Sequence, residues 1–234
     1  MRPASLLAVA VSAVLGVALG IGGGLALDSG PATFEDPLHL EHALVNQPCT
    51  GEFVLVIGKG DGGSALGPGL ASNPNGRYLD TRESCATVYR DSSRPTPRWI
   101  AYLGPYGSGA QACTLRMTAE NKGTTVARLQ QDAPDTVHCL CYLDYHTMPT
   151  LQTGMTAGIT DGMWTRALQN MLVDMGRARK ADATGVYDLT TASQIRRIQR
   201  EHNLAATGVV DADTWHAVQE GCQLYDVPST KASP

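Results

Sequence analysis

The stretch "ATGVVDADTWHAV", Ala206–Val218, has an earlier copy in "ATGVYDLTTASQI", Ala183–Ile195. The two copies begin 23 residues apart, a spacing typical of a duplicated supersecondary unit. In each copy a glycine permits a tight turn with positive φ, and an Asp with a Thr three residues later can cap the next helix. The phrase therefore predicts two equivalent turns, each leading into a helix, and it favours a scaffold over a reaction site.

A further helix is predicted before the first copy. The stretch "TDGMWTRALQNMLVDMG", residues 160–176, places apolar residues at the three- and four-residue spacing of an amphipathic helix and ends on Gly176. The helix after the first turn presents Ile195 and Ile198 inward, and the helix after the second presents Trp215. Together these patterns predict three helices around one apolar centre.

With these motifs, residues 159–219 resemble the peptidoglycan-binding domain of type 1, a three-helix module of cell-wall hydrolases and noncatalytic wall proteins. The resemblance implies a three-helix orthogonal bundle with peptidoglycan as partner, either through its glycan strand or its stem peptide. The residues that match the family pattern, which we expect to be mainly structural, are Leu168, Gln169, Gly185, Thr191, Ile198, Gly208, Asp211, Thr214 and Trp215.

A groove for wall peptide or glycan needs cationic or amide side chains beside an aromatic surface. The candidates for ligand binding in this region are Tyr187, Arg197, Gln199 and Arg200. The alternative is that Tyr187 belongs to the core and that the arginines form a solvated face.

The N-terminus carries an uncharged apolar run, Ala4–Leu27, after one positive residue. A helix of this length spans roughly 36 Å, which is enough to cross a bilayer core. Acidic residues follow the run, so the chain after it is expected outside the cytoplasmic membrane. The run is either a retained transmembrane anchor or a cleaved signal peptide, and both interpretations export the remainder to the cell wall side.

Six cysteines fit an exported protein stabilised by disulfides. They are Cys49, Cys85, Cys113, Cys139, Cys141 and Cys222. On a strand, the two cysteines of "CLC", residues 139–141, face the same way, so each is expected to pair elsewhere than with its neighbour. We predict that Cys222 pairs with Cys139 or Cys141 and joins two domains.

The middle of the chain begins with a buried strand, Phe53–Ile57, followed by a literal GxGxxG pattern at residues 58–63. Glycines and prolines soon after it favour a flexible loop over the helix that dinucleotide binding requires. A second strand near Trp99, a helix over residues 109–121 and a strand over residues 124–129 follow.

The motif "YLGPYGS", residues 102–108, with the helix after it and Gly123, resembles half of a sporulation-related repeat (SPOR) domain. This family has a βαββαβ fold and binds septal glycan, and the expected glycine-rich loop departs from its pattern. The resemblance implies that Trp99 or Tyr102 offers a ring to sugars, unless both rings belong to the core.

The remaining composition excludes several functions. A net charge of −4 gives no electrostatic reason to expect a nucleic-acid partner. His39 and His42 lack a third metal ligand, and the segment between Cys49 and Leu143 lacks the residue patterns of hydrolase catalysis. We therefore expect no catalytic residues, no metal and no cofactor. Four lysines against fourteen arginines favour a high-GC actinobacterial origin.

The sequence thus predicts an α+β protein, with a membrane helix, a disulfide-stabilised α/β sandwich-like middle domain and a three-helix bundle. The expected function is noncatalytic attachment to the wall, as a membrane-anchored or secreted protein. The alternative is a wall hydrolase, or an obligate activator of one, and a partner wall enzyme stays unidentified. The expected divisions are a cytoplasmic start at 1–3, an anchor or signal at 4–27, a spacer at 28–48, a SPOR-like domain at 49–143, a linker at 144–158, a peptidoglycan-binding domain at 159–224 and a tail at 225–234.

Overall fold

The computed structural model describes residues 35–85, 96–130, 137–155 and 159–225. None of the helices in these ranges has the length and apolar character needed to cross a membrane. The run Ala4–Leu27, the start at residues 1–3 and most of the expected tail lie outside the described residues, so these predictions stay predictions.

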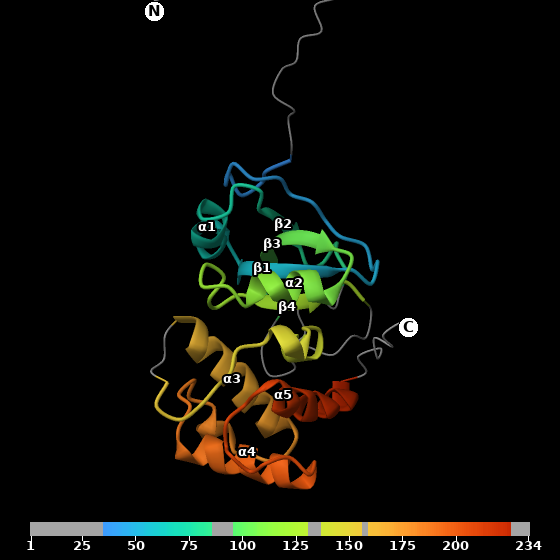
Figure 1. Cartoon of the computed structure of the whole chain (residues 1–234). Coiled ribbons are helices and arrows are strands. Elements are labelled where there is room, and N and C mark those ends of the chain that lie inside the picture. Colours follow the sequence, from blue (N-terminus) through green and yellow to red (C-terminus); the bar gives the residue numbers. More distant parts are fainter. Residues whose placement is uncertain (1–34, 86–95, 131–136, 156–158, 226–234) are drawn as a thin grey trace, which may run out of the picture. The chain divides into compact units, whose positions relative to one another are not determined.

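The first folded part is a four-stranded antiparallel sheet with the strand order β2-β3-β1-β4 (Figure 1). Two long strands, β1 (Phe53–Gly60) and β3 (Trp99–Tyr106), form its centre. The outer strands are β2 (Arg77–Asp80) and β4 (Thr125–Arg128). Helix α1 (Gly63–Ala71) follows β1, and helix α2 (Gly109–Arg116) follows β3. The element order is βαββαβ, and the helix predicted over 109–121 ends earlier. The SPOR resemblance stays a prediction.

The first four residues of each central strand, Phe53–Val56 and Trp99–Tyr102, are buried because both faces of the sheet are covered there. Phe53 and Leu55 belong to the face on which α1 and α2 pack, and Val54 and Val56 belong to the opposite face. Tyr102 packs with Val54 and Val56 on that opposite face.

Neither ring suggested for sugar binding is available on the surface. Trp99 is 5% exposed and Tyr102 is fully buried. The Tyr102 hydroxyl donates a hydrogen bond to the carbonyl of Val45 and accepts one from Gln47. The prediction that these rings contact glycan is therefore wrong, because both are core residues.

Helix α1 corrects the prediction of a flexible loop after β1. The glycines of the GxGxxG pattern allow this helix to pack directly on the strand, since a Cβ at Gly60 would overlap Ala65. At Gly69 a Cβ would overlap the carbonyl of Ile57. Pro68 lies within the helix rather than preventing it. The glycines therefore serve helix–strand packing, which the sequence pattern alone did not distinguish from a loop.

Residues 35–48 were predicted as a spacer, but they pack against the sheet. Leu44 forms a parallel bridge with Tyr78, and the Tyr78 hydroxyl donates to the carboxylate of Asp36. Gln47 is buried against Tyr102, as described above. This segment therefore covers part of the sheet, and we call the described residues between 35 and 130 the sheet domain.

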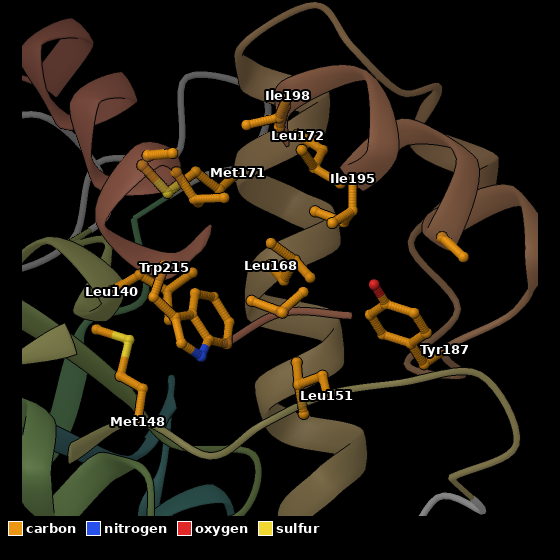
Figure 2. Close-up of a cluster of buried hydrophobic side chains, with 14 residues drawn as sticks. Leu140, Met148, Leu151, Leu168, Met171, Leu172, Tyr187, Ile195, Ile198 and Trp215 are labelled. Atoms are coloured by element: carbon orange, nitrogen blue, oxygen red, sulfur yellow. The ribbon is translucent and has the colours of Figure 1, made fainter. Parts of the chain in front are cut away.

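The second folded part contains the three predicted helices, α3 (Ile159–Asp174), α4 (Leu189–Glu201) and α5 (Ala212–Gln219). Their apolar side chains form one buried cluster, shown in Figure 2, with Trp215 and Tyr187 among aliphatic side chains. Asp188 caps α4 and Asp211 caps α5 through the amides of Thr191 and Thr214, as predicted.

The segment predicted as a linker is part of this core. Leu151 is fully buried and forms an antiparallel bridge with Val210. The indole of Trp215 donates a hydrogen bond to the carbonyl of Pro149. Because residues 144–155 pack in the core, we call the described residues from 144 to 225 the bundle.

The "CLC" motif joins the two folded parts. It forms a 3₁₀ helix, Cys139–Cys141, and not the strand that was expected. Three residues per turn direct Cys139 and Cys141 to different sides, whereas a strand would direct them to the same side. Cys139 pairs with Cys113 of α2, and Cys141 pairs with Cys222. The predicted pairing of Cys222 is confirmed, and a third disulfide, Cys49–Cys85, lies within the sheet domain.

Candidate functional site

The first repeated turn is held by the side chain of Gln169. Its Oε1 accepts a hydrogen bond from the amide of Gly185, 2.8 Å away. Its Nε2 donates to the Val186 carbonyl and to the Thr191 hydroxyl, each at 2.9 Å. Gly185 has φ +82°, the left-handed region that the turn requires.

The second turn repeats this network around Gln199. Its Oε1 accepts from the amide of Gly208 at 2.8 Å, and its Nε2 donates to the Val209 carbonyl and to the Thr214 hydroxyl. The side chain is 1% exposed. The repeated phrase is therefore a scaffold in both copies, as the spacing predicted.

This arrangement overturns half of the predicted ligand site. Gln199 is buried in its network, and Tyr187 is 2% exposed with its hydroxyl donating to the Gly208 carbonyl at 2.7 Å (Figure 2). Burial raises the pKa of Tyr187, which keeps the hydroxyl protonated as a donor. Arg197 and Arg200 are exposed, and Arg197 pairs with Glu201. The four candidates thus do not share one surface, since two of them are core residues.

A cavity of about 550 Å³ lies elsewhere, bounded by residues of both folded parts. The sheet domain contributes the end of α2 and the residues before β4. The bundle contributes one side of α3 and the first repeated turn, including Gly185. Its volume is in the range of pockets that hold small molecules or short peptides.

Three cationic side chains line this cavity: Arg116, Lys122 and Arg166. Its described lining contains no carboxylate. Burial lowers the pKa of Arg116, because water solvates this guanidinium less than it would at the surface. His138 also lines the cavity, and burial lowers its pKa while Asp174, 3.6 Å away, opposes that shift. The cavity therefore presents positive potential on a partly apolar wall.

Arg166 belongs to the repeat itself. Its Nη2 donates to the Thr184 carbonyl at 2.7 Å, and its guanidinium lies beside Gly185. Arg196 lies beside Gly208 in the same way, three residues before Gln199, as Arg166 is three residues before Gln169. The two arginines are therefore counterparts, but only Arg166 lines the cavity. The repeated Arg-x-Leu/Ile-Gln spacing is a sequence signal for Arg166 that the prediction missed.

The Cys139–His138 pair considered for catalysis has no free thiol. Cys139, next to His138, is in a disulfide and has no thiolate to act as a nucleophile. In the ranges that the structure describes, no three His, Cys, Asp or Glu side chains group as metal ligands would. His42 donates from Nδ1 to the Gly76 carbonyl at 2.8 Å, in a loop of the sheet domain.

One of three comparisons with known proteins found a match, and it falls in the bundle. No curated protein and no solved structure matches the chain. Residues 165–218 match the family model described as "Putative peptidoglycan binding domain". The match runs from within α3 through both repeated turns into α5, so the resemblance of the C-terminal region to a peptidoglycan-binding domain is confirmed.

Proposed function

We propose that this protein is an exported, noncatalytic protein that attaches to peptidoglycan through its bundle. The observation that carries the proposal is the family match over residues 165–218, whose repeated turns are intact in the structure. The match supports cell-wall binding. The proposals that the protein is exported and noncatalytic rest on other features.

Export is supported by the cysteines and the N-terminal sequence. All six cysteines form disulfides, which persist outside the reducing cytoplasm. The apolar run Ala4–Leu27 supplies either a membrane anchor or a cleaved signal. Both routes place the folded parts on the side of the membrane that faces the wall.

The absence of catalysis is part of the proposal and has its own support. The cysteine beside His138 is oxidised. Carboxylates also serve structural roles, since Asp80 accepts hydrogen bonds from two arginines and Asp211 accepts one from a helix amide. A scaffold of this kind binds polymer without cleaving it.

The test is co-sedimentation of the full chain, in mild detergent, with purified wall sacculi that carry a fluorescent label. We expect the protein to pellet with the sacculi and to release no soluble labelled fragments. A protein that stays in the supernatant contradicts wall binding. Release of fragments contradicts the noncatalytic assignment and favours the wall hydrolase instead.

The same assay addresses the activator alternative when a wall hydrolase is added. We expect the rate of fragment release to be unchanged by the protein. A higher rate of fragment release in the presence of the intact protein would contradict passive attachment and favour an activator of the hydrolase.

A further inference from the structure

The cationic side chains of the cavity contrast with five arginines that pair with carboxylates. Among the described residues, Arg82 and Arg98 pair with Asp80, Arg177 and Arg197 pair with Glu201, and Arg179 pairs with Asp182. No such pair with Arg116, Lys122 or Arg166 is found within the described ranges. The cavity therefore brings together three cations that have no carboxylate partner among the described residues.

This arrangement has an energetic cost for Arg116 in the unliganded protein. Its guanidinium is partly buried, and the contact nearest to a hydrogen bond is to the Met163 sulfur at 3.7 Å, a weak acceptor. Removing a cation from water without a carboxylate partner is unfavourable. An anionic ligand in the cavity would offset this cost, whereas a neutral sugar would not.

The rest of the lining fits a peptide. Met163 and Met117 offer apolar surface to small side chains, and Asn170 offers an amide that can pair with a peptide bond. Arginine is suited to planar, two-bond recognition of a carboxylate, and lysine adds a point charge. Carboxylates distinguish the stem peptide of peptidoglycan from its glycan, which carries hydroxyls and amides.

Resting on the proposed function, we infer that this cavity binds the stem peptide of peptidoglycan through its free carboxylates. Arg166 of the bundle and Arg116 and Lys122 of the sheet domain are the carboxylate-binding residues. The site is consequently shared by two folded parts, and the family domain supplies only one side of it. The disulfides at Cys139 and Cys141 hold the segment that joins the two sides.

The test measures binding of a soluble stem tetrapeptide with free carboxylates to the full chain by calorimetry. The comparison ligands are the same peptide with its carboxyls amidated and an uncharged oligosaccharide of N-acetylglucosamine, which has the hydroxyls and amides of the glycan but no carboxylate. We expect the free peptide to bind at least about ten-fold more tightly than either comparison ligand, because charge-assisted hydrogen bonds are lost in both. Equal binding of the amidated peptide, or tighter binding of the glycan, overturns the inference.

Variants locate the site. Arg116→Gln and Arg166→Gln are each expected to weaken peptide binding roughly ten-fold or more, and Lys122→Gln less, because Lys122 is exposed. Arg196→Gln is the matched control, since Arg196 occupies the equivalent place beside the second turn but does not line the cavity. Arg197→Gln tests the surface favoured by the sequence. An effect of Arg196→Gln or Arg197→Gln as large as that of Arg166→Gln overturns the placement.

Arg166 also supports the first turn, so folding is monitored by the thermal transition. Arg116→Gln and Lys122→Gln keep the test decisive if Arg166→Gln unfolds the bundle. Full peptide binding by both of these variants contradicts the site. Pelleting with sacculi that is unchanged in these variants overturns the inference and leaves the proposed function standing. Failure of the unaltered chain to pellet overturns the proposed function.

Discussion

The sheet domain and the bundle bury their apolar side chains in different ways. Among the described residues, those of the sheet domain fall into three small clusters on the two faces of the sheet. The bundle gathers its buried residues into one cluster of fourteen around Trp215, which includes Leu140 of the "CLC" motif. Their interior polar groups differ as well, because the bundle uses neutral glutamines whereas the sheet domain uses the ionised Asp80 with two arginines. A small divided core depends more on cross-links and charge, and a continuous core depends on packing.

The largest effect is expected from Trp215→Ala in the bundle. Trp215 is fully buried, and its removal leaves a large cavity and an unpaired Pro149 carbonyl, so the free energy of unfolding should fall by about 3–5 kcal/mol. Chemical denaturation followed by circular dichroism measures it. Leu189→Ala, at a side chain 71% exposed, is the control and should change stability little. A loss below about 1 kcal/mol for Trp215→Ala would show that the cluster does not act as one core.

The next effect concerns the Cys49–Cys85 disulfide of the sheet domain. Its removal in a Cys49→Ser, Cys85→Ser variant should destabilise this domain by about 2–4 kcal/mol, since the bond closes a long loop. Amide hydrogen exchange reports the two parts separately. We expect protection to fall at Val54 and to remain at Ile198, and an equal loss at both would mean that the two parts unfold together.

The glutamine networks should contribute less and should match each other. Gln169→Leu and Gln199→Leu each leave a glycine amide without its acceptor, which costs about 1–3 kcal/mol. Gln223→Leu, at an exposed position, is the control. Denaturation midpoints measure the three variants. A cost for Gln199→Leu alone would contradict the equivalence of the two turns.

The smallest effect is the pH dependence of Asp80. Hydrogen bonds from Arg82 and Arg98 lower the pKa of this carboxyl from 3.8 to about 2. The ionised Asp80 therefore stabilises the fold above pH 3.8, and this contribution is lost as the pH falls toward 2 and the carboxylate is protonated. Asp80→Asn should therefore cost about 1–2 kcal/mol at pH 7, since the exposed arginines are screened by solvent.

The same experiment separates charge from packing. The cost of Asp80→Asn should decrease as the pH falls from 4 to 2, whereas the cost of Gln199→Leu should stay constant because an amide does not titrate there. Urea denaturation at several pH values measures both. A pH-independent cost at Asp80 would indicate that its ionisation does not stabilise the sheet domain.

The amount that the sequence predicted differs between the two parts for a physical reason. The bundle is built from local signals, because caps, turn glycines and helical periodicity act within a few residues of each other. Asp188, Asp211, Gly185 and Gly208 were therefore predicted correctly. In the sheet domain, the glycines that seemed to forbid α1 instead fit against β1, and this contact is between residues brought together by packing.

The binding residues were the least predictable. Tyr187 and Gln199 had suitable chemistry, but their burial follows from the way the second turn folds over α4 and could not be read from spacing. Arg166 carried a signal in the repeat. Arg116 carried none, since it reaches the cavity from α2, which is distant from the bundle in sequence.

By itself, the sequence determined the three-helix bundle, its peptidoglycan-binding resemblance and the pairing of Cys222 with the "CLC" motif. The bundle was predictable because it depends on short-range periodicity and capping, whereas the sequence left Cys139 and Cys141 open as the partner of Cys222. Only the tertiary structure decided that residues 35–48 and 144–155 belong to the folded parts, and that Arg116 and Arg166 meet at one cavity. Those outcomes depend on long-range packing, in which residues far apart in the chain exclude water from the same surface.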